Sequence, residues 1–381
     1  MSVELLGISW NHTRGLLPLV ATAQRFAETH PDVEIFWEKR SLQAFADRPL
    51  DDLAAQFDLL VIDHPFVGLA ARKQTLLPLD ELLPSHFLDD QAWHSVGRSH
   101  QSYHHGDHQW ALAIDAAAPV SSWRPDLLEQ WGVPLPGTWE ELLRLARRGR
   151  VVVPAVPVDC LMNFFMLCST LGEDPFTDSS VVVSPERGLE ALRLLQELLS
   201  LCSTDCYSWN PIDVYEAMTS RDDVGYCPFA YGYSNYTRSG YAGHRLLFGE
   251  LVTLDNDRRL RSTLGGTGLA ISACCPHPKL AAEYVQYVTS PQCQRTIYFE
   301  SGGQPGHRQA WLDQNVNVRS LNFFQDTLPV LDRAYLRPRY AGYLHFQDKA
   351  GGLVHQFLRD GGNPVSVLNQ LNEIYKESHA S

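Results

Sequence analysis

Basic residues are scarce in this sequence of 381 residues, which has 31 Lys and Arg against 44 Asp and Glu and a net charge of −13. An acidic surface repels the phosphates of nucleic acids and of anionic membranes, so we predict neither as a partner. A small ligand is not excluded, because a local pocket can differ in sign from the whole surface. With 44% hydrophobic and 20% charged residues the composition is that of a globular protein, and the length allows two domains.

Recognisable catalytic motifs are also missing. The sequence contains no GxSxG nucleophile elbow, and none of its cysteines has a nucleophile signature. The glycine-rich segment GGTG at residues 265–268 lacks the Walker lysine and the GxGxxG spacing, and it precedes a predicted strand, which argues against a nucleotide site. We therefore predict that the protein is not an enzyme and has no cofactor. An enzyme that uses histidine and aspartate for acid–base chemistry stays as an alternative.

Several histidines gather around one glycine without the pattern of a metal site. They are His100, His104, His105 and His108, with Asp107 among them. Their spacing fits a turn at Gly106 and not one face of a helix, whereas a metal needs convergent ligands of fixed geometry. We predict a solvated loop here and no metal site in the chain.

The cysteines form no CxxC pair, and a chain of this length does not depend on a disulfide framework. The eight are Cys160, Cys168, Cys202, Cys206, Cys227, Cys274, Cys275 and Cys293. Several stand among apolar residues, where cysteine acts as a small hydrophobe, so we expect reduced and buried thiols. A bridge between Cys202 and Cys206 in an oxidising compartment stays open.

Long hydrophobic runs are absent too. The most apolar stretch, residues 151–171, contains Pro154, Pro157, Asp159 and Asn163, so we predict a buried strand, turn and helix there and not a membrane span. The N-terminus shows no basic region, apolar core or lipidated cysteine of a leader. We expect a periplasmic or extracellular protein if a leader was removed, and a cytoplasmic one if the chain is complete as given.

In the first hundred residues, segments with the hydrophobic pattern of strands alternate with a segment that has helical spacing. Residues 3–9, 33–37 and 57–62 read as strands, and residues 16–29 carry apolar side chains at helical spacing. This alternation predicts an α/β fold with a parallel sheet, whose ligands gather beyond the carboxyl ends of the strands.

Two of these strand ends carry polar side chains. Trp10, His12 and Arg14 follow the first strand, and Asp63 and His64 follow the third. An arginine beside a helix N-terminus favours an anionic group such as a carboxylate, although a surface ion pair would explain it equally. Asp63 can orient a ligand hydroxyl or can simply cap a turn.

The second half of the chain is richer in helices. Thr138 and Glu141 form a capping box, and Ser184-Pro185 has the pattern of a capped helix start. A predicted strand at residues 224–229 leads into a loop of aromatic and amide side chains, with Tyr231, Tyr233 and Asn235. These tyrosines, like Trp10 and Trp209, can stack on a ligand or pack in the core.

Three segments in sequence order carry a family resemblance: GDHQWALAID at residues 106–115, WRPDLLEQWG at 123–132 and PGTWEEL at 136–142. They resemble the central signature of bacterial extracellular solute-binding proteins of the maltose-binding type. Residues 264–272 are similar to that family's return strand, residues 301–308 to a later loop, and residues 364–376 to its closing helix.

The resemblance implies a two-lobed periplasmic-binding-protein-like fold of type II. Lobe one would comprise residues 1–113 plus 264–310, and lobe two residues 117–260 plus 320–381. Hinge crossings would lie near residues 113–117, 260–264 and 310–320, with the ligand cleft between the lobes. By position, the ligand contacts would be Trp10, His12, Arg14, Asp63, His64, Asp115, Trp209, Tyr231, Tyr233, Asn235, Gly266 and Gln304.

The function that follows from the resemblance is capture of a small polar solute by hinge closure. The solute would be a sugar, a sugar acid or a related carboxylate, delivered by a monomeric protein to an ABC permease. A cytoplasmic ligand sensor on the same fold is the alternative.

Overall fold

The computed structural model describes residues 2–41, 50–255 and 258–379, and divides the chain into two compact units. Unit 1 contains Met1–Ala117, Gly265–Arg319 and Arg339–Ala341; unit 2 contains Ala118–Leu264, Ser320–Pro338 and Gly342–Ser381. The chain therefore passes between the units five times. Within the described ranges, no helix is both long and apolar enough to cross a membrane.

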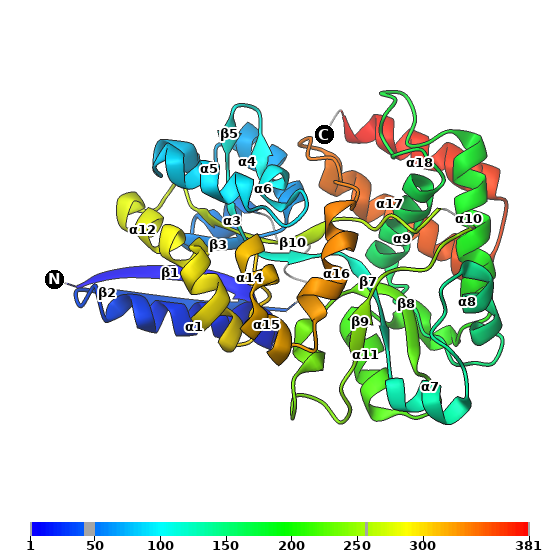
Figure 1. The fold of residues 1–381 in the computed structure, drawn as a ribbon. Coiled ribbons are helices and arrows are strands. Elements are labelled where there is room, and N and C mark those ends of the chain that lie inside the picture. The colour runs from blue at the N-terminus through cyan, green and yellow to red at the C-terminus, as the bar shows by residue number, and fades with distance from the viewer. Residues whose placement is uncertain (1, 42–49, 256–257, 380–381) are drawn as a thin grey trace. The chain divides into compact units, whose positions relative to one another are not determined.

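Unit 1 is built on a five-stranded mixed sheet with the order β2-β1-β3-β10-β6 (Figure 1). The strands are β1 (Val3–Trp10), β2 (Val33–Arg40), β3 (Leu59–Ile62), β6 (Leu112–Ala117) and β10 (Gly265–Ile271). Strand β1 runs parallel to β2 and β3, which confirms the parallel pairing predicted for the first hundred residues. The return strand β10 is antiparallel to both β3 and β6, so the complete sheet is mixed.

Two long helices, α1 (Thr13–Ala27) and α12 (Pro278–Thr289), pack against each other and against this sheet. Their apolar faces contribute Leu19, Phe26 and Val285 to a core that also contains Leu5 and Ile114 from the strands. Shorter elements before β6 and after β10 complete unit 1. They are α3 (Leu50–Ala54), α4 (Val67–Lys73), α5 (Ser85–Trp93), α6 (Ser99–Ser102), β4 (His104–His105), β5 (His108–Gln109), α13 (Pro291–Cys293), α14 (Arg308–Leu312) and α15 (Gln314–Arg319).

The short segment Arg339–Ala341 is held in unit 1 by a close backbone approach. A Cβ atom on Gly68 of α4 would lie 1.6 Å from the carbonyl oxygen of Arg339, so only glycine fits there. The Arg339 guanidinium also donates to the carbonyl oxygen of His104, at 2.9 Å.

Unit 2 combines a small antiparallel sheet, of order β8-β7-β9, with a larger set of helices. The strands are β7 (Pro119–Trp123), β8 (Tyr226–Tyr231) and β9 (Leu247–Gly249). The helices are α7 (Pro125–Trp131), α8 (Trp139–Ala146), α9 (Pro157–Thr170), α10 (Pro185–Ser200), α11 (Pro211–Ser220), α16 (Phe323–Asp332), α17 (Tyr343–Asp360) and α18 (Pro364–Ser378).

The apolar stretch of unit 2 forms the predicted buried helix, but the predicted strand before it is reduced to a single bridge between Val151 and Tyr226. Residues Asp159–Thr170 of α9 are all buried, and the helix packs on α10 and α17. Contact with α17 is close at Gly351, where a Cβ atom would lie 2.9 Å from the carbonyl oxygen of Pro157.

The two helix starts predicted from caps have different outcomes. Thr138 and Glu141 form the expected reciprocal capping box of α8. Ser184 does occupy the N-cap of α10, but its hydroxyl makes no capping bond there. It donates instead to the carboxylate of Glu173, whose other oxygen accepts the Ser184 backbone N–H at 2.6 Å. Ser184 is thus the N-cap residue that the sequence predicts, but its side chain bonds to Glu173 and caps no backbone N–H of α10.

Candidate ligand-binding site

The turn after β1 places His12 and Arg14 at the start of α1. His12 is the N-cap residue, and its Nδ1 accepts the backbone N–H of Arg14 at 3.0 Å. Burial, assisted by the nearby Arg14 charge, lowers the pKa of His12 to about 4. The imidazole is therefore neutral at neutral pH. The helix start is packed tightly, since a Cβ on Gly15 would lie 2.4 Å from the ring of Trp10.

The side chain of Arg14 forms a buried ion pair with Asp115 of β6. Its Nε donates to Oδ2 of Asp115 at 2.6 Å, and its Nη2 donates to Oδ1 at 2.5 Å. The two side chains are 5% and 0% exposed, so this pair is deep inside unit 1 and not on its surface. Burial raises the pKa of Asp115, and the guanidinium opposes that shift. The charge of Arg14 is thus matched within the protein.

Backbone and amide groups complete the surroundings of Asp115. Gly266 has a φ of +105°, and a Cβ there would lie 2.3 Å from the Asp115 carbonyl oxygen, so the return strand requires glycine at this point. Gln304 donates from Nε2 to the carbonyl oxygen of Ala116 at 2.8 Å. Gly266 and Gln304 are therefore both brought to the β6 strand that carries Asp115.

Two buried hydroxyls in this region were not predicted from the sequence. Thr267 pairs with Asp115 across the β10–β6 ladder, and Tyr298 is close enough for Asp115 and Arg14 to influence its pKa. Over the part of the chain that the structure describes, neither hydroxyl has a hydrogen-bond partner. Tyr298 ends a five-residue π-helix, Gln294–Tyr298, and such short π segments are frequent at functional sites.

The end of β3 carries the other two candidates of unit 1. Asp63 accepts the backbone N–H of His64 at 2.8 Å and so caps the short 3-10 helix His64–Phe66. His64 is fully buried, with its ring edge-on to that of Tyr103 at a centroid distance of 6.3 Å. The capping interpretation of Asp63 is thus observed, and a ligand contact from either residue stays a prediction.

The candidates of unit 2 follow β8. Tyr231 is half-buried at the end of that strand, with its hydroxyl 3.3 Å from the Thr263 hydroxyl. Tyr233 is 7% exposed and packs edge-on to Tyr215, and Asn235 is 1% exposed in the next 3-10 helix. The structure thus brings these three candidates together on one loop, where Tyr231 keeps the most exposed surface.

Trp209 contacts the segment that leads into α9, whose first turn carries a carboxyl group that the sequence analysis used only as an argument against a membrane span. Its carbonyl oxygen accepts the backbone N–H of Ala155, just before α9, and Asp159 is in the first turn of that helix. Asp159 is 5% exposed, and burial, together with the charge of Asp213, raises its pKa to about 8. A protonated Asp159 can donate a hydrogen bond to a ligand oxygen. Carboxylates so perturbed are recurrent in functional sites.

The histidine-rich segment forms the predicted turn. Strands β4 and β5 pair as a hairpin around Gly106, which has a φ of +61°. At its end, His108 contacts the carboxylate of Asp80 at 2.8 Å.

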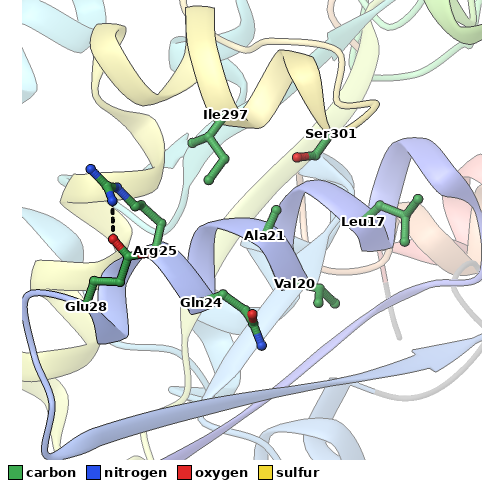
Figure 2. Close-up of a pocket in the computed structure, with 8 residues that line it drawn as sticks. All are labelled: Leu17, Val20, Ala21, Gln24, Arg25, Glu28, Ile297 and Ser301. Atoms are coloured by element: carbon green, nitrogen blue, oxygen red, sulfur yellow. Dashed lines mark hydrogen bonds and ion pairs between the residues drawn. The ribbon is translucent and has the colours of Figure 1, made fainter.

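An open groove of about 630 Å³ lies on the outer face of α1, away from the predicted contacts (Figure 2). An ion pair between Arg25 and Glu28 stands at one end of it. Its lining residues are Leu17, Val20, Ala21, Gln24, Arg25, Glu28, Ile297 and Ser301. None of the twelve candidate contacts is among them.

Part of the chain is similar to one family of known proteins. Residues 9–166 match the sequence model of bacterial extracellular solute-binding proteins. Over this range the chain is similar to that family. It is 24% identical over 379 residues to a probable ABC transporter-binding protein of Deinococcus radiodurans, covering 92% of this chain and 87% of that protein. A mannitol-binding protein of Pseudomonas aeruginosa is 27% identical over 150 residues, or 38% of this chain and 34% of that protein.

Solved structures of solute-binding proteins share the fold along its whole length. The T. maritima protein MalE3 with bound maltose has a TM-score of 0.85 at 20% identity, covering 99% of this chain and 100% of that one. An ABC transporter solute-binding protein from Agrobacterium radiobacter, in complex with ribitol, has a TM-score of 0.81 at 17% identity and 98% coverage of both chains. The predicted two-lobed α/β fold class is thereby confirmed.

Several functional predictions follow the family. The proteins that match are substrate-binding proteins of ABC transporters, which are not enzymes, in agreement with the prediction that this chain is not an enzyme. An extracellular family implies a periplasmic or extracellular location.

Proposed function

We propose that this solute-binding protein captures a neutral polyhydroxylated molecule, a sugar or a sugar alcohol, and delivers it as a monomer to an ABC importer. The observation that carries the proposal is the match of residues 9–166 to the family. The ligand class is supported by the mannitol-binding relative and by the structural neighbours with maltose and ribitol.

The ionisable candidates favour a neutral solute over a sugar acid. Arg14 is matched by Asp115 in a buried ion pair, and His12 has a pKa of about 4, which leaves it uncharged at neutral pH. Asp159, with a pKa of about 8, is also mainly neutral there. A carboxylate ligand needs a compensating cation when it leaves water, whereas hydroxyl groups need donors and acceptors.

The proposed binding mode uses aromatic and polar side chains. Trp209 and Tyr231 keep part of their rings exposed and are suited to cover the C–H surface of a sugar. Asp159 would donate to a hydroxyl oxygen, and the residues that follow β1 and β3 are separate candidate contacts within unit 1.

A thermal-shift screen tests the ligand class. The panel pairs D-mannitol, ribitol and maltose with the corresponding sugar acids, at neutral pH. A neutral solute at a hundred times its Kd stabilises the folded protein by about 2.7 kcal/mol, which raises the Tm by roughly 5–11 °C for units of this size. A shift with acids alone would contradict a neutral ligand, and no shift across a broad panel of both classes would contradict solute capture.

Two tryptophan variants locate the site. Trp209→Ala should abolish the shift produced by the best neutral solute, because it removes the proposed stacking surface. Trp93→Ala is the matched control, since Trp93 on α5 is 84% exposed and is not among the candidate contacts. Equal shifts in both variants would exclude Trp209 from the site. Size-exclusion chromatography with light scattering tests the monomer.

A further inference from the structure

Three potential metal ligands meet in unit 1 from segments more than 200 residues apart. Asp90 lies in α5, and His94 follows one helical turn later at its C-cap. His307 precedes α14 and is held beside them by its backbone, since the Arg308 N–H donates to the His94 carbonyl oxygen at 2.8 Å and Ser95 pairs with His307. The three side chains are therefore fixed together by main-chain contacts that do not depend on a ligand.

The donor atoms converge. Nδ1 of His94 lies 2.9 Å from Oδ1 of Asp90, and Nε2 of His307 lies 3.3 Å from Oδ2 of the same carboxylate. One donor atom from each of the three residues lies within 4.8 Å of the others. A tetrahedral zinc ion with bonds of about 2.0–2.2 Å to nitrogen and oxygen needs donors about 3.4 Å apart, so small side-chain rotations suffice.

The exposure of the three side chains would let an ion enter and leave the cluster. His307 is 1% exposed at its side chain, whereas Asp90 and His94 are 38% and 26% exposed, so the cluster opens to solvent on one side. A metal binds the neutral form of an imidazole.

The neighbouring Gln309 contacts both histidines. A bound metal would be compatible with the contact to His94 and would break the contact to His307. Its side-chain amide lies 3.3 Å from Nε2 of His94, where an amide turned by 180° would accept the ring proton of a metal-bound imidazole. Its backbone N–H donates to Nδ1 of His307 at 3.3 Å. Metal at Nε2 moves the His307 proton to Nδ1 and ends this contact, which is already long for a hydrogen bond.

We propose that Asp90, His94 and His307 form a binding site for a transition-metal ion of the Zn²⁺ type, with water completing the coordination. Two imidazoles and one carboxylate favour zinc and related ions over Ca²⁺ and Mg²⁺, which prefer oxygen. The ion would join α5 to the segment before α14 and stabilise unit 1. This site is separate from the twelve candidate ligand contacts and does not depend on the proposed function. The sequence analysis predicted no metal site because neither short segment has a recognisable motif.

Isothermal titration of the full chain with ZnCl₂ tests the proposal, using untagged protein stripped with EDTA and then freed of chelator. We expect one equivalent of zinc to bind with a Kd in the micromolar range or below and to raise the Tm. Asp90→Asn and His94→Gln should each raise that Kd at least tenfold. His86→Gln is the matched control, because His86 is an exposed histidine of the same helix.

Two outcomes would overturn the site. One is the absence of stoichiometric binding to the wild type at millimolar zinc. The other is unchanged binding in both Asp90→Asn and His94→Gln, which would place the ion elsewhere, such as the histidine hairpin of β4 and β5. Both altered side chains are partly exposed, so circular dichroism of the variants is expected to match the wild type and to keep the comparison valid.

Discussion

Removal of one partner from the Arg14–Asp115 pair should destabilise unit 1 strongly. The pair is bidentate, with contacts of 2.6 and 2.5 Å, and both side chains are almost completely buried. Arg14→Ala leaves an uncompensated carboxyl group at the end of β6, and breaking a buried pair in this way costs about 3–5 kcal/mol. For a unit of this size the Tm should fall by roughly 6–20 °C.

A double-mutant cycle measures the coupling directly. Arg14→Ala, Asp115→Ala and the double variant are compared with the wild type by urea unfolding, followed by circular dichroism and tryptophan fluorescence. The double variant should be less destabilised than the sum of the single variants by at least about 2 kcal/mol, because its second substitution removes the stranded charge. Full additivity, with Arg14→Ala costing less than about 1 kcal/mol, would refute the reasoning, since that is the value of an exposed pair.

The pH dependence of the Arg14→Ala variant gives an independent check. Burial raises the pKa of Asp115 in the folded protein, and the substitution removes the cation that opposes this shift. The folded state of the variant then binds a proton more tightly than the unfolded state. Its stability relative to the wild type should therefore increase as the pH falls from 7 towards the unfolded pKa, near 4. If the difference in stability between the variant and the wild type were constant from pH 7 to 4, burial would not be raising the pKa of Asp115 in the variant.

Three further predictions concern single side chains. His12 has a folded pKa of about 4 against an ordinary value of 6.5, so the free energy of unfolding should fall by at most about 3 kcal/mol as the pH drops from 6.5 to 4. In urea titrations, His12→Asn should keep the helix cap and lose this pH dependence. Asp159, with a folded pKa of about 8, has the opposite sign: stability should fall by up to about 5 kcal/mol between pH 4 and 8, and Asp159→Asn should flatten that slope. Gly68→Ala should cost at least about 1–3 kcal/mol because its Cβ would meet the Arg339 carbonyl, whereas Gly352→Ala, at an open position of α17, should be neutral or stabilising by thermal unfolding.

Features with local causes were predictable from the sequence. The capping box of Thr138 and Glu141 spans four residues, and both partners are visible in one reading of the chain. The turn at Gly106 and the buried helix α9 likewise depend on residues close in sequence. Ser184 shows the limit of such local reasoning. Its hydroxyl donates a hydrogen bond to the carboxylate of Glu173, which lies eleven residues earlier on another segment.

The candidate site was harder to predict because its contacts are long-range. Arg14 and Asp115 are 101 residues apart and meet only when β6 and the return strand β10 complete the sheet. From the sequence, Arg14 could equally serve an anionic ligand or an ion pair, and the sheet order is what gives it a buried partner. Asp159 was overlooked for a related reason: its raised pKa comes from burial, which a single residue in an apolar stretch does not reveal.

The electrostatics of the candidate residues differ from those of the whole chain. A net charge of −13 acts over the surface and disfavours polyanions, but it is screened within about 10 Å at ordinary ionic strength. Among the candidates, Arg14 is matched, His12 is deprotonated and Asp159 is protonated at neutral pH, so none of the three offers an unbalanced charge. Because selectivity for hydroxyl groups comes from leaving buried donors and acceptors unpaired when a hydroxyl is missing, neutral side chains can discriminate among polyols. The acidity that excludes nucleic acid therefore has no bearing on which solute is bound.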